Sequence, residues 1–254
     1  QERSYVLALE TAAPVGGMYI GEEKNSLSFR DAEGILLFGG AGTRTGKNRE
    51  GGNFEQLMQS AKVFYPACKA VYRWAAQDCM PHDQIPYIGL LSEKWPGVYV
   101  ATGFQKWGMT SSMAAAEILT DFICGRENGD APVFSPQRFH PFVSTPKLLI
   151  DGAQTVYSIA KEKLEIPRET LFAIPNGTAA VVKVEGEKVG VYKTPDGGAY
   201  CVTVRCPHLG CRLEWNPAEL SWDCPCHGSR FDYTGKLLND PAQTEIGFQK
   251  EKKQ

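Results

Sequence analysis

The sequence predicts two kinds of structure, an α+β region of mixed sheet plus helices followed by a small all-β module. Up to about residue 143, apolar runs of strand length alternate with stretches that have helical spacing. From about residue 169, Val-rich runs are separated by Gly and Pro turn signals. A proline-punctuated segment with little periodicity lies between them, as is typical of linkers. We therefore expect domains at residues 1–143 and 169–254, joined by a linker at residues 144–168.

The first region is expected to open with short strands and to contain two helices. Its expected strands are Tyr5–Leu9, Met18–Ile20, Ser26–Arg30, Ile35–Gly39 and the buried strand Val98–Ala101. A helix is expected over Asn53–Val63, because Phe54, Leu57 and Ala61 recur at helical spacing. A second helix is expected over Thr110–Cys124, and Gly125 ends it.

The C-terminal region has the pattern of a small sheet. The expected strands are Ala179–Val184, Lys188–Lys193 and Ala199–Val204. The turn residues Pro195, Asp196, Gly197 and Gly198 separate the last two. These runs predict a small all-β domain.

The composition excludes several classes of protein. The 254 residues are 43% hydrophobic and 22% charged, which are ordinary values for a globular protein. With 27 Lys and Arg against 29 Asp and Glu, the net charge of −2 indicates no basic face for nucleic acid. No apolar run approaches the roughly 20 residues of a membrane helix, and no signal peptide pattern is present, so we expect a cytoplasmic protein without a membrane span. The chain begins at Gln1 in the middle of a pattern, which suggests a piece of a longer protein.

Cysteine and histidine cluster near the C-terminus in a spacing that indicates a metal site. Four of the 8 cysteines and two of the 4 histidines lie within residues 206–227. A zinc site would favour two Cys-x-x-Cys knuckles, or one knuckle with a pair of histidines. Instead, each half offers one cysteine and one histidine, as Cys206-x-His208 and Cys224-x-x-His227. Two Cys on one iron and two His on the other form the ligand set of a Rieske [2Fe–2S] centre.

This spacing closely resembles the Rieske family, whose pattern is C-x-H, a spacer and then C-x-x-H. The resemblance implies that Cys206 and Cys224 hold the inner iron, and that His208 and His227 hold the outer, more exposed one. Because four protein ligands saturate the two irons, such a centre relays electrons and does not bind substrate. A structural zinc site remains the alternative.

Further residues resemble the surroundings of such a cluster. Cys211 and Cys226 match an extra pair that, in one branch of the family, forms a disulfide between the cluster loops. Ser229 matches a serine that donates a hydrogen bond to a bridging sulfide in the high-potential members, whereas Phe231 stands where they have a tyrosine hydroxyl. Asn239–Ala242 resembles the proline-bearing loop that covers the cluster. With one donor missing, we expect a reduction potential below that of the Rieske proteins of respiratory complexes.

Three segments of the first region resemble the C-terminal half of FAD-dependent amino-acid-oxidase-like proteins. They are Arg73–Asp78 leading to Asp83–Gly89, then Gly97–Phe104, and Gly108–Thr110. The resemblance implies a partial FAD-dependent oxidoreductase domain in which Gly103, Gly108, Met109 and Thr110 lie against the flavin. A small-residue turn lets the backbone approach a planar ligand, and a helix N-terminus presents free N–H groups. For any one segment alone, an ordinary strand–turn–helix unit is the alternative.

Two departures limit this second resemblance. No G-x-G-x-x-G follows a strand, and the glycine-rich stretch Gly39–Gly46 has the wrong spacing and is expected to be a loop. The half of the fold that binds the FAD pyrophosphate is therefore expected upstream, so that FAD is a cofactor of the full-length form and this chain alone is not expected to hold it tightly. Asp78 stands where amino-acid-oxidizing members have an arginine for the substrate carboxylate, so an α-amino acid substrate is not expected, and no catalytic residue is assigned.

These observations predict a redox protein that passes single electrons through a Rieske [2Fe–2S] cluster to or from a flavin site. An electron donor or acceptor protein, or a small-molecule substrate, is the expected partner. The alternatives are an electron-carrier module without catalysis of its own and a zinc-stabilised binding protein. A Rieske oxygenase is disfavoured, because its separate iron needs two histidines and a carboxylate, and the only spare histidines are His82 and His140. In full-length form we expect an FAD-dependent oxidoreductase, of which this chain is expected to be an inactive fragment.

Overall fold

The computed structural model describes residues 1–23, 26–138, 149–150, 152–153, 155–158, 160 and 173–248. The chain divides into two compact units. Unit 1 consists of residues 1–2 and 77–153, and unit 2 of residues 3–76 and 154–254. Most of the predicted linker at 144–168 lies outside the described residues, and the predicted domain boundaries remain a prediction.

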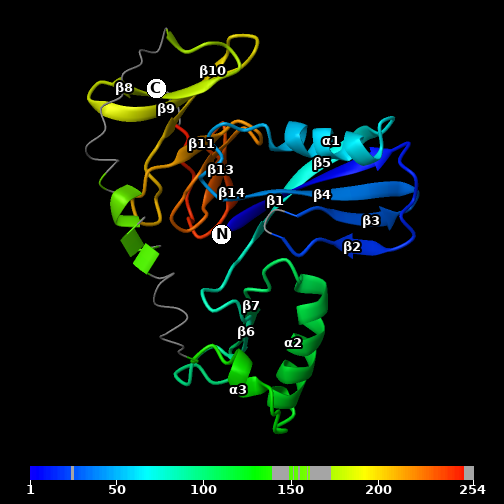
Figure 1. The fold of residues 1–254 in the computed structure, drawn as a ribbon. Coiled ribbons are helices and arrows are strands. Elements are labelled where there is room, and N and C mark those ends of the chain that lie inside the picture. Colours follow the sequence, from blue (N-terminus) through cyan, green and yellow to red (C-terminus); the bar gives the residue numbers. More distant parts are fainter. Residues whose placement is uncertain are drawn as a thin grey trace, which may run out of the picture. The chain divides into compact units, whose positions relative to one another are not determined.

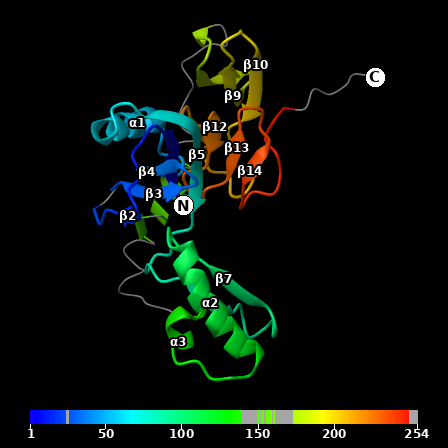
Figure 2. The same ribbon diagram turned by 90° about the vertical axis from the view of Figure 1, so that its right-hand side faces the viewer.

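A five-stranded sheet in the order β2-β3-β4-β1-β5 begins the chain, and α1 lies along one of its faces (Figures 1 and 2). The strands are β1 Glu2–Glu10, β2 Met18–Ile20, β3 Ser28–Ala32, β4 Ile35–Arg44 and β5 Lys69–Asp78, and the helix is α1 Asn53–Phe64. Tyr5, Leu7 and Leu9 alternate along β1 and pack with Phe38 of β4 and Leu57 of α1 in one core. The four early strands and the first helix predicted from the sequence are thereby confirmed, although β4 extends beyond its predicted end at Gly39 to Arg44.

The prediction of a loop over the glycine-rich stretch Gly39–Gly46 was wrong, because β4 continues to Arg44. Its glycines allow a close approach that larger residues would block. A Cβ atom on Gly39 would lie 2.5 Å from Ser28 Oγ, and one on Gly40 would lie 2.9 Å from Leu27 Cδ2. The glycines therefore serve sheet packing in this stretch, and only its end forms a turn.

Unit 1 packs a hairpin against helices. The hairpin consists of β6 Tyr87–Leu90 and β7 Tyr99–Thr102, and the helices are α2 Gly108–Ile123 and α3 Ala131–Phe134. Ile88 of β6 is fully buried against Ala115 and Ile118 of α2. The predicted strand Val98–Ala101 is present one residue later, but its burial was wrong, since Val98 is 45% exposed and β7 pairs with β6 alone. The predicted second helix is confirmed.

Arg138 and Asp83 form a buried ion pair in unit 1. Their side chains are 4% and 5% exposed, and Arg138 donates from Nε to Asp83 Oδ2 (2.8 Å) and from Nη2 to Oδ1 (3.0 Å). The guanidinium also donates to the carbonyl of Pro86 (2.9 Å) and lies 3.9 Å from the centroid of the Tyr87 ring. This pair fixes the loop that leads into β6.

We expect Asp83→Asn to lower the free energy of unfolding of unit 1 by about 3 kcal/mol at neutral pH, because it leaves the Arg138 charge buried and unpaired. Hydrogen bonds from Arg138 hold the pKa of Asp83 below its ordinary value. Because the folded-state pKa is lowered, this contribution is complete above about pH 4 and is lost as the pH falls further. Urea unfolding from about pH 6 to pH 2 should show the two proteins converging at the acid end. Asp121→Asn, which removes the exposed pair with Arg126, is the control, and equal effects of the two variants would contradict the assignment.

The C-terminal residues form two small sheets. The first contains β8 Ala179–Val184, β9 Glu187–Lys193 and β10 Ala199–Thr203, and the second contains β11 Glu214–Asn216, β12 Ser221–Asp223, β13 Arg230–Asp232 and β14 Leu237–Asn239. Val202, Leu213, Trp222 and Phe231 are buried in the core that these strands share with the clustered cysteines. The all-β region is thereby confirmed. No helix of the described residues has the length and apolar character needed to cross a membrane.

Candidate metal centre

The loop between β10 and β11 and the loop between β12 and β13 have the same pattern of backbone hydrogen bonds. In each loop, the amide of a cysteine donates to the carbonyl five residues later, and a glycine four residues later donates back to the carbonyl of that cysteine. The bonds are Cys206 to Cys211 (2.8 Å) and Gly210 to Cys206 (2.8 Å), and Cys224 to Ser229 (2.8 Å) and Gly228 to Cys224 (3.1 Å). Both glycines have positive φ angles, 74° and 87°, which residues with a side chain disfavour. The sequence analysis missed these glycines, although their equal spacing from the two cysteines was a usable signal.

This hydrogen-bond pattern brings Cys206 and Cys224 together in the core. Each is 1% exposed, and their thiols are hydrogen-bonded to each other. The bond to the Cys224 thiol lowers the pKa of Cys206 to about 6, and the Cys224 pKa is raised because its proton is held by Cys206 and two further cysteines. Thiolates and not thiols bind metals, and the lowered pKa of Cys206 favours its thiolate at neutral pH.

His208 and His227 form the second pair. Their ring centroids lie 4.9 Å apart, with the ring planes at 89°. The Nδ1 atom of His208 is buried and has no hydrogen-bond partner among the described residues. A buried imidazole nitrogen costs free energy unless it is bound, so this atom fits a metal ligand. Of the spare histidines, His82 belongs to unit 1 and His140 lies outside the described residues.

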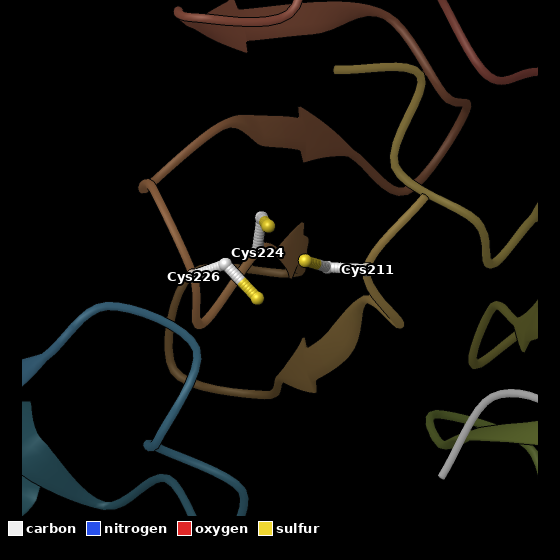
Figure 3. A group of neighbouring side chains, drawn as sticks. All are labelled: Cys211, Cys224 and Cys226. Carbon is white, nitrogen blue, oxygen red and sulfur yellow. The ribbon is translucent and has the colours of Figure 1, made fainter. Parts of the chain in front are cut away.

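Three thiols lie close together in the same place. The sulfur atoms of Cys211, Cys224 and Cys226 are within 4.8 Å of one another (Figure 3). The predicted Cys211–Cys226 disulfide is absent from this structure, where both residues are free cysteines. In this structure the two sulfur atoms lie in one group with the Cys224 thiol. Oxidation of Cys211 and Cys226 to a disulfide therefore stays a prediction.

Ser229 joins the second cluster loop to the loop that follows β14. Its side chain is fully buried, and its hydroxyl hydrogen-bonds to the Cys206 thiol and accepts a bond from the Ala242 amide (3.0 Å). The predicted proline-bearing loop Asn239–Ala242 is therefore tied to the cysteines. Phe231 is fully buried in the same core and has no polar atom to offer them.

We expect Phe231→Tyr to raise the reduction potential of a cluster bound here by roughly 40 mV, which corresponds to about 1 kcal/mol for one added hydrogen bond. The new hydroxyl would stabilise the negative charge gained on reduction. Protein-film voltammetry measures the shift. Tyr233→Phe is the control, because it removes a hydroxyl from a ring that packs against Tyr192 and Tyr200. A lowered potential in Phe231→Tyr would contradict the role of this position.

The predicted flavin contacts lie around the start of α2. Gly108, Met109 and Thr110 form its first turn, where no side chain caps the helix and no acidic residue occurs. Met109 is 87% exposed, and a Cβ atom on Gly108 would meet nothing within 4 Å. Gly103 is buried, and its Cβ would lie 2.6 Å from Pro81 Cγ, so that its packing against Pro81 already requires glycine. An open, uncapped turn fits a flavin, and the assignment remains a prediction.

Comparison with known proteins finds a matching family model for each region. Residues 169–249 match the Rieske [2Fe-2S] domain, and residues 1–122 match the FAD dependent oxidoreductase family. A Bacillus subtilis (strain 168) protein named as the Rieske 2Fe-2S iron-sulfur protein YhfW is 37% identical over 247 residues, which are 95% of this chain and 48% of the relative. The cytochrome b6-f complex iron-sulfur subunit 2 of Trichormus variabilis is 35% identical over 93 residues, which are 35% of this chain and 52% of that protein.

Among solved structures, glycine oxidase from Geobacillus kaustophilus matches with a TM-score of 0.46 and 19% identity, covering 55% of this chain and 39% of that one. The chain spans about half the length of the curated relatives described above. The two matched families imply a [2Fe–2S] cluster and FAD as cofactors. The chain is thus similar to the FAD dependent oxidoreductase family over residues 1–122 and to the Rieske [2Fe-2S] domain over residues 169–249.

Proposed function

We propose that this chain is an electron-transfer protein whose cluster is held by Cys206, Cys224, His208 and His227. One observation carries the proposal: the fold pairs the two thiols with each other and the two imidazoles with each other. That separation of sulfur from nitrogen donors matches a centre with Cys on one iron and His on the other. A tetrahedral zinc site has no need of it.

The protein's own residues prepare the site in three ways. The core around Trp222 and Phe231 excludes water from the thiols, which strengthens every electrostatic interaction there. Ser229 directs its hydroxyl at Cys206, where it stabilises thiolate charge. When bound, a cluster with two imidazole ligands supplies one-electron transfer at a higher potential than an all-thiolate cluster.

The flavin side of the proposal rests on α2. Its open first turn offers the amides of Gly108, Met109 and Thr110 to an anionic or electron-rich edge of a bound ring. A flavin bound there would supply two-electron chemistry, and the partner on the other side of the cluster would be an electron donor or acceptor protein or a small molecule. Asp78 disfavours an α-amino acid as the substrate. A cytoplasmic location remains a prediction.

The proposal is tested by iron and sulfide analysis with EPR spectroscopy of the dithionite-reduced chain. Two irons and two sulfides per chain, with the rhombic signal of a mixed-ligand cluster, are expected. Zinc at one ion per chain would instead identify Cys211, Cys224 and Cys226 as a structural site and would refute the electron-transfer role. A fluorescence titration with FAD separately measures whether residues 1–122 bind the flavin.

A further inference from the structure

The turn that follows β4 packs directly on the second cluster loop. A Cβ atom on Gly46 would lie 2.5 Å from Pro225 N and 2.6 Å from Pro225 Cα, so that only glycine permits this approach. Pro225 lies between Cys224 and Cys226. Gly51, five residues after Gly46, makes a similar approach, because its Cβ atom would lie 2.7 Å from Pro217 Cγ. Both glycines also have positive φ angles, 73° and 70°. A turn from the FAD dependent oxidoreductase region therefore covers part of the Rieske region.

A buried amide pair holds this turn in place. Asn48 donates from Nδ2 to Asn216 Oδ1 (3.1 Å) and to Tyr5 Oη (3.0 Å), and its Oδ1 accepts a bond from the Gly51 amide (3.1 Å). Asn216 donates in turn to Asp223 Oδ2 (3.0 Å). Asn48 and Asn216 are 9% and 2% exposed. Because the buried amides of Asn48 and Asn216 share a hydrogen bond, separating the two regions would cost free energy.

A chain of buried charges reinforces the same contact. Arg3 of β1 and Arg230 of β13 both donate to Glu219, and Arg230 also donates to Asp223 Oδ1 (2.9 Å). The side chains of Arg3, Glu219, Arg230 and Asp223 are 4%, 13%, 5% and 1% exposed. Removing Arg230 would leave the buried Asp223 carboxylate without its ion-pair partner, and removing Glu219 would do the same to the Arg3 guanidinium. These ion pairs join β1 to the Rieske region within unit 2.

Arg44 stands at the end of β4, at the point where this turn meets the cluster loop. Its Nη2 atom donates to the carbonyl oxygen of Pro225 across 3.5 Å in a partly buried setting. Reduction adds one negative charge to a cluster held by the neighbouring Cys224. A cation fixed beside that loop favours the reduced form, since the interaction of charges strengthens away from bulk water.

We infer that the turn after β4 is part of the cluster's surroundings and that Arg44 is a positioning residue that raises the cluster's reduction potential. The inference rests on the proposed function, because it takes Cys206, Cys224, His208 and His227 as the ligands. It assigns to the oxidoreductase region a role in setting the potential of the centre with which it exchanges electrons.

The test compares two arginines of the same turn by EPR-monitored redox titration of the intact chain. Arg44→Met is expected to shift the midpoint potential of the cluster to a lower value, and Arg44→Lys is expected to recover most of the shift by keeping the charge. Arg49→Met is the matched control. It removes the same charge from the same turn, but Arg49 is half exposed and pairs with Glu214 (2.7 Å), away from the cluster loop. If Arg44→Met does not fold, Arg44→Gln gives the same comparison with a smaller change of side chain.

A second comparison uses the two glycines. Gly46→Ala must push Pro225 away, and it is expected to lower the potential in the same direction as Arg44→Met. Gly51→Ala disturbs the contacts with Pro217 and Ala218, and its potential is expected to stay close to that of the wild type. Equal shifts in Arg44→Met and Arg49→Met, or no shift in Arg44→Met, would overturn the inference while the cluster signal persists. Absence of a cluster signal in the wild type would instead refute the proposed function.

Discussion

Replacing Cys224 with serine is expected to remove the iron centre almost completely, lowering bound iron by roughly tenfold or more. Cys224 is 1% exposed and lies in hydrogen-bonding contact with Cys206, Cys211 and Cys226. Serine cannot supply the thiolate that binds the metal at this buried position. Iron content, visible absorption and the EPR signal of the reduced protein measure the loss.

Cys201→Ser is the matched control, because Cys201 is an exposed cysteine of β10 in the same region. It should leave the iron content unchanged. Cys211→Ser and Cys226→Ser complete the series, since they remove the two thiols that the ligand set does not need. If either of these loses the iron while Cys224→Ser keeps it, the assignment of ligands is wrong.

Arg230→Met is expected to lower the free energy of unfolding of unit 2 by about 3–5 kcal/mol, because it leaves a buried carboxylate unpaired. Arg230 binds Asp223, Glu219, Ser221 and Asn239 at once, and Asp223 is 1% exposed. The loss should appear in urea unfolding curves as a lower midpoint with an unchanged slope.

The pH dependence of this variant has a defined sign. Burial raises the pKa of Asp223, and Arg230 is the main group that opposes the rise. Without Arg230 the folded protein binds a proton at Asp223 more readily than the unfolded chain does, so the deficit should grow as the pH rises above about 4 and shrink below it. Arg230→Met with Asp223→Asn should recover part of the stability. A deficit below about 1 kcal/mol at neutral pH would contradict a buried, coupled network.

Local patterns in the sequence predicted most of the elements and the composition of the site. Strands β1, β2, β8 and β9 follow from runs of apolar residues, and the Cys206-x-His208 and Cys224-x-x-His227 spacings marked the two loops that the fold brings together. These features depend on residues that are neighbours along the chain. They can therefore be predicted without knowing the fold.

Contacts between distant residues could not be predicted in this way. Arg3 and Glu219 are 216 positions apart, and Asn48 and Asn216 are 168 positions apart, so no periodicity links them. Gly46 was taken as part of a loop because its spacing fits no nucleotide-binding motif. Its need for glycine comes from Pro225, which a single sequence cannot place beside it.

The buried charges between β1 and β13 bear on how the Rieske region can be studied. Excising it as a fragment would delete Arg3 and bring Glu219 into water, while Asn216 would lose the amide of Asn48. In the fragment, Glu219 and Asn216 would face water, whereas in the intact protein Arg3 and Asn48 contact them. The reduction potential measured on such a fragment would differ from that of the intact protein. The smallest fragment suitable for electrochemistry therefore includes β1.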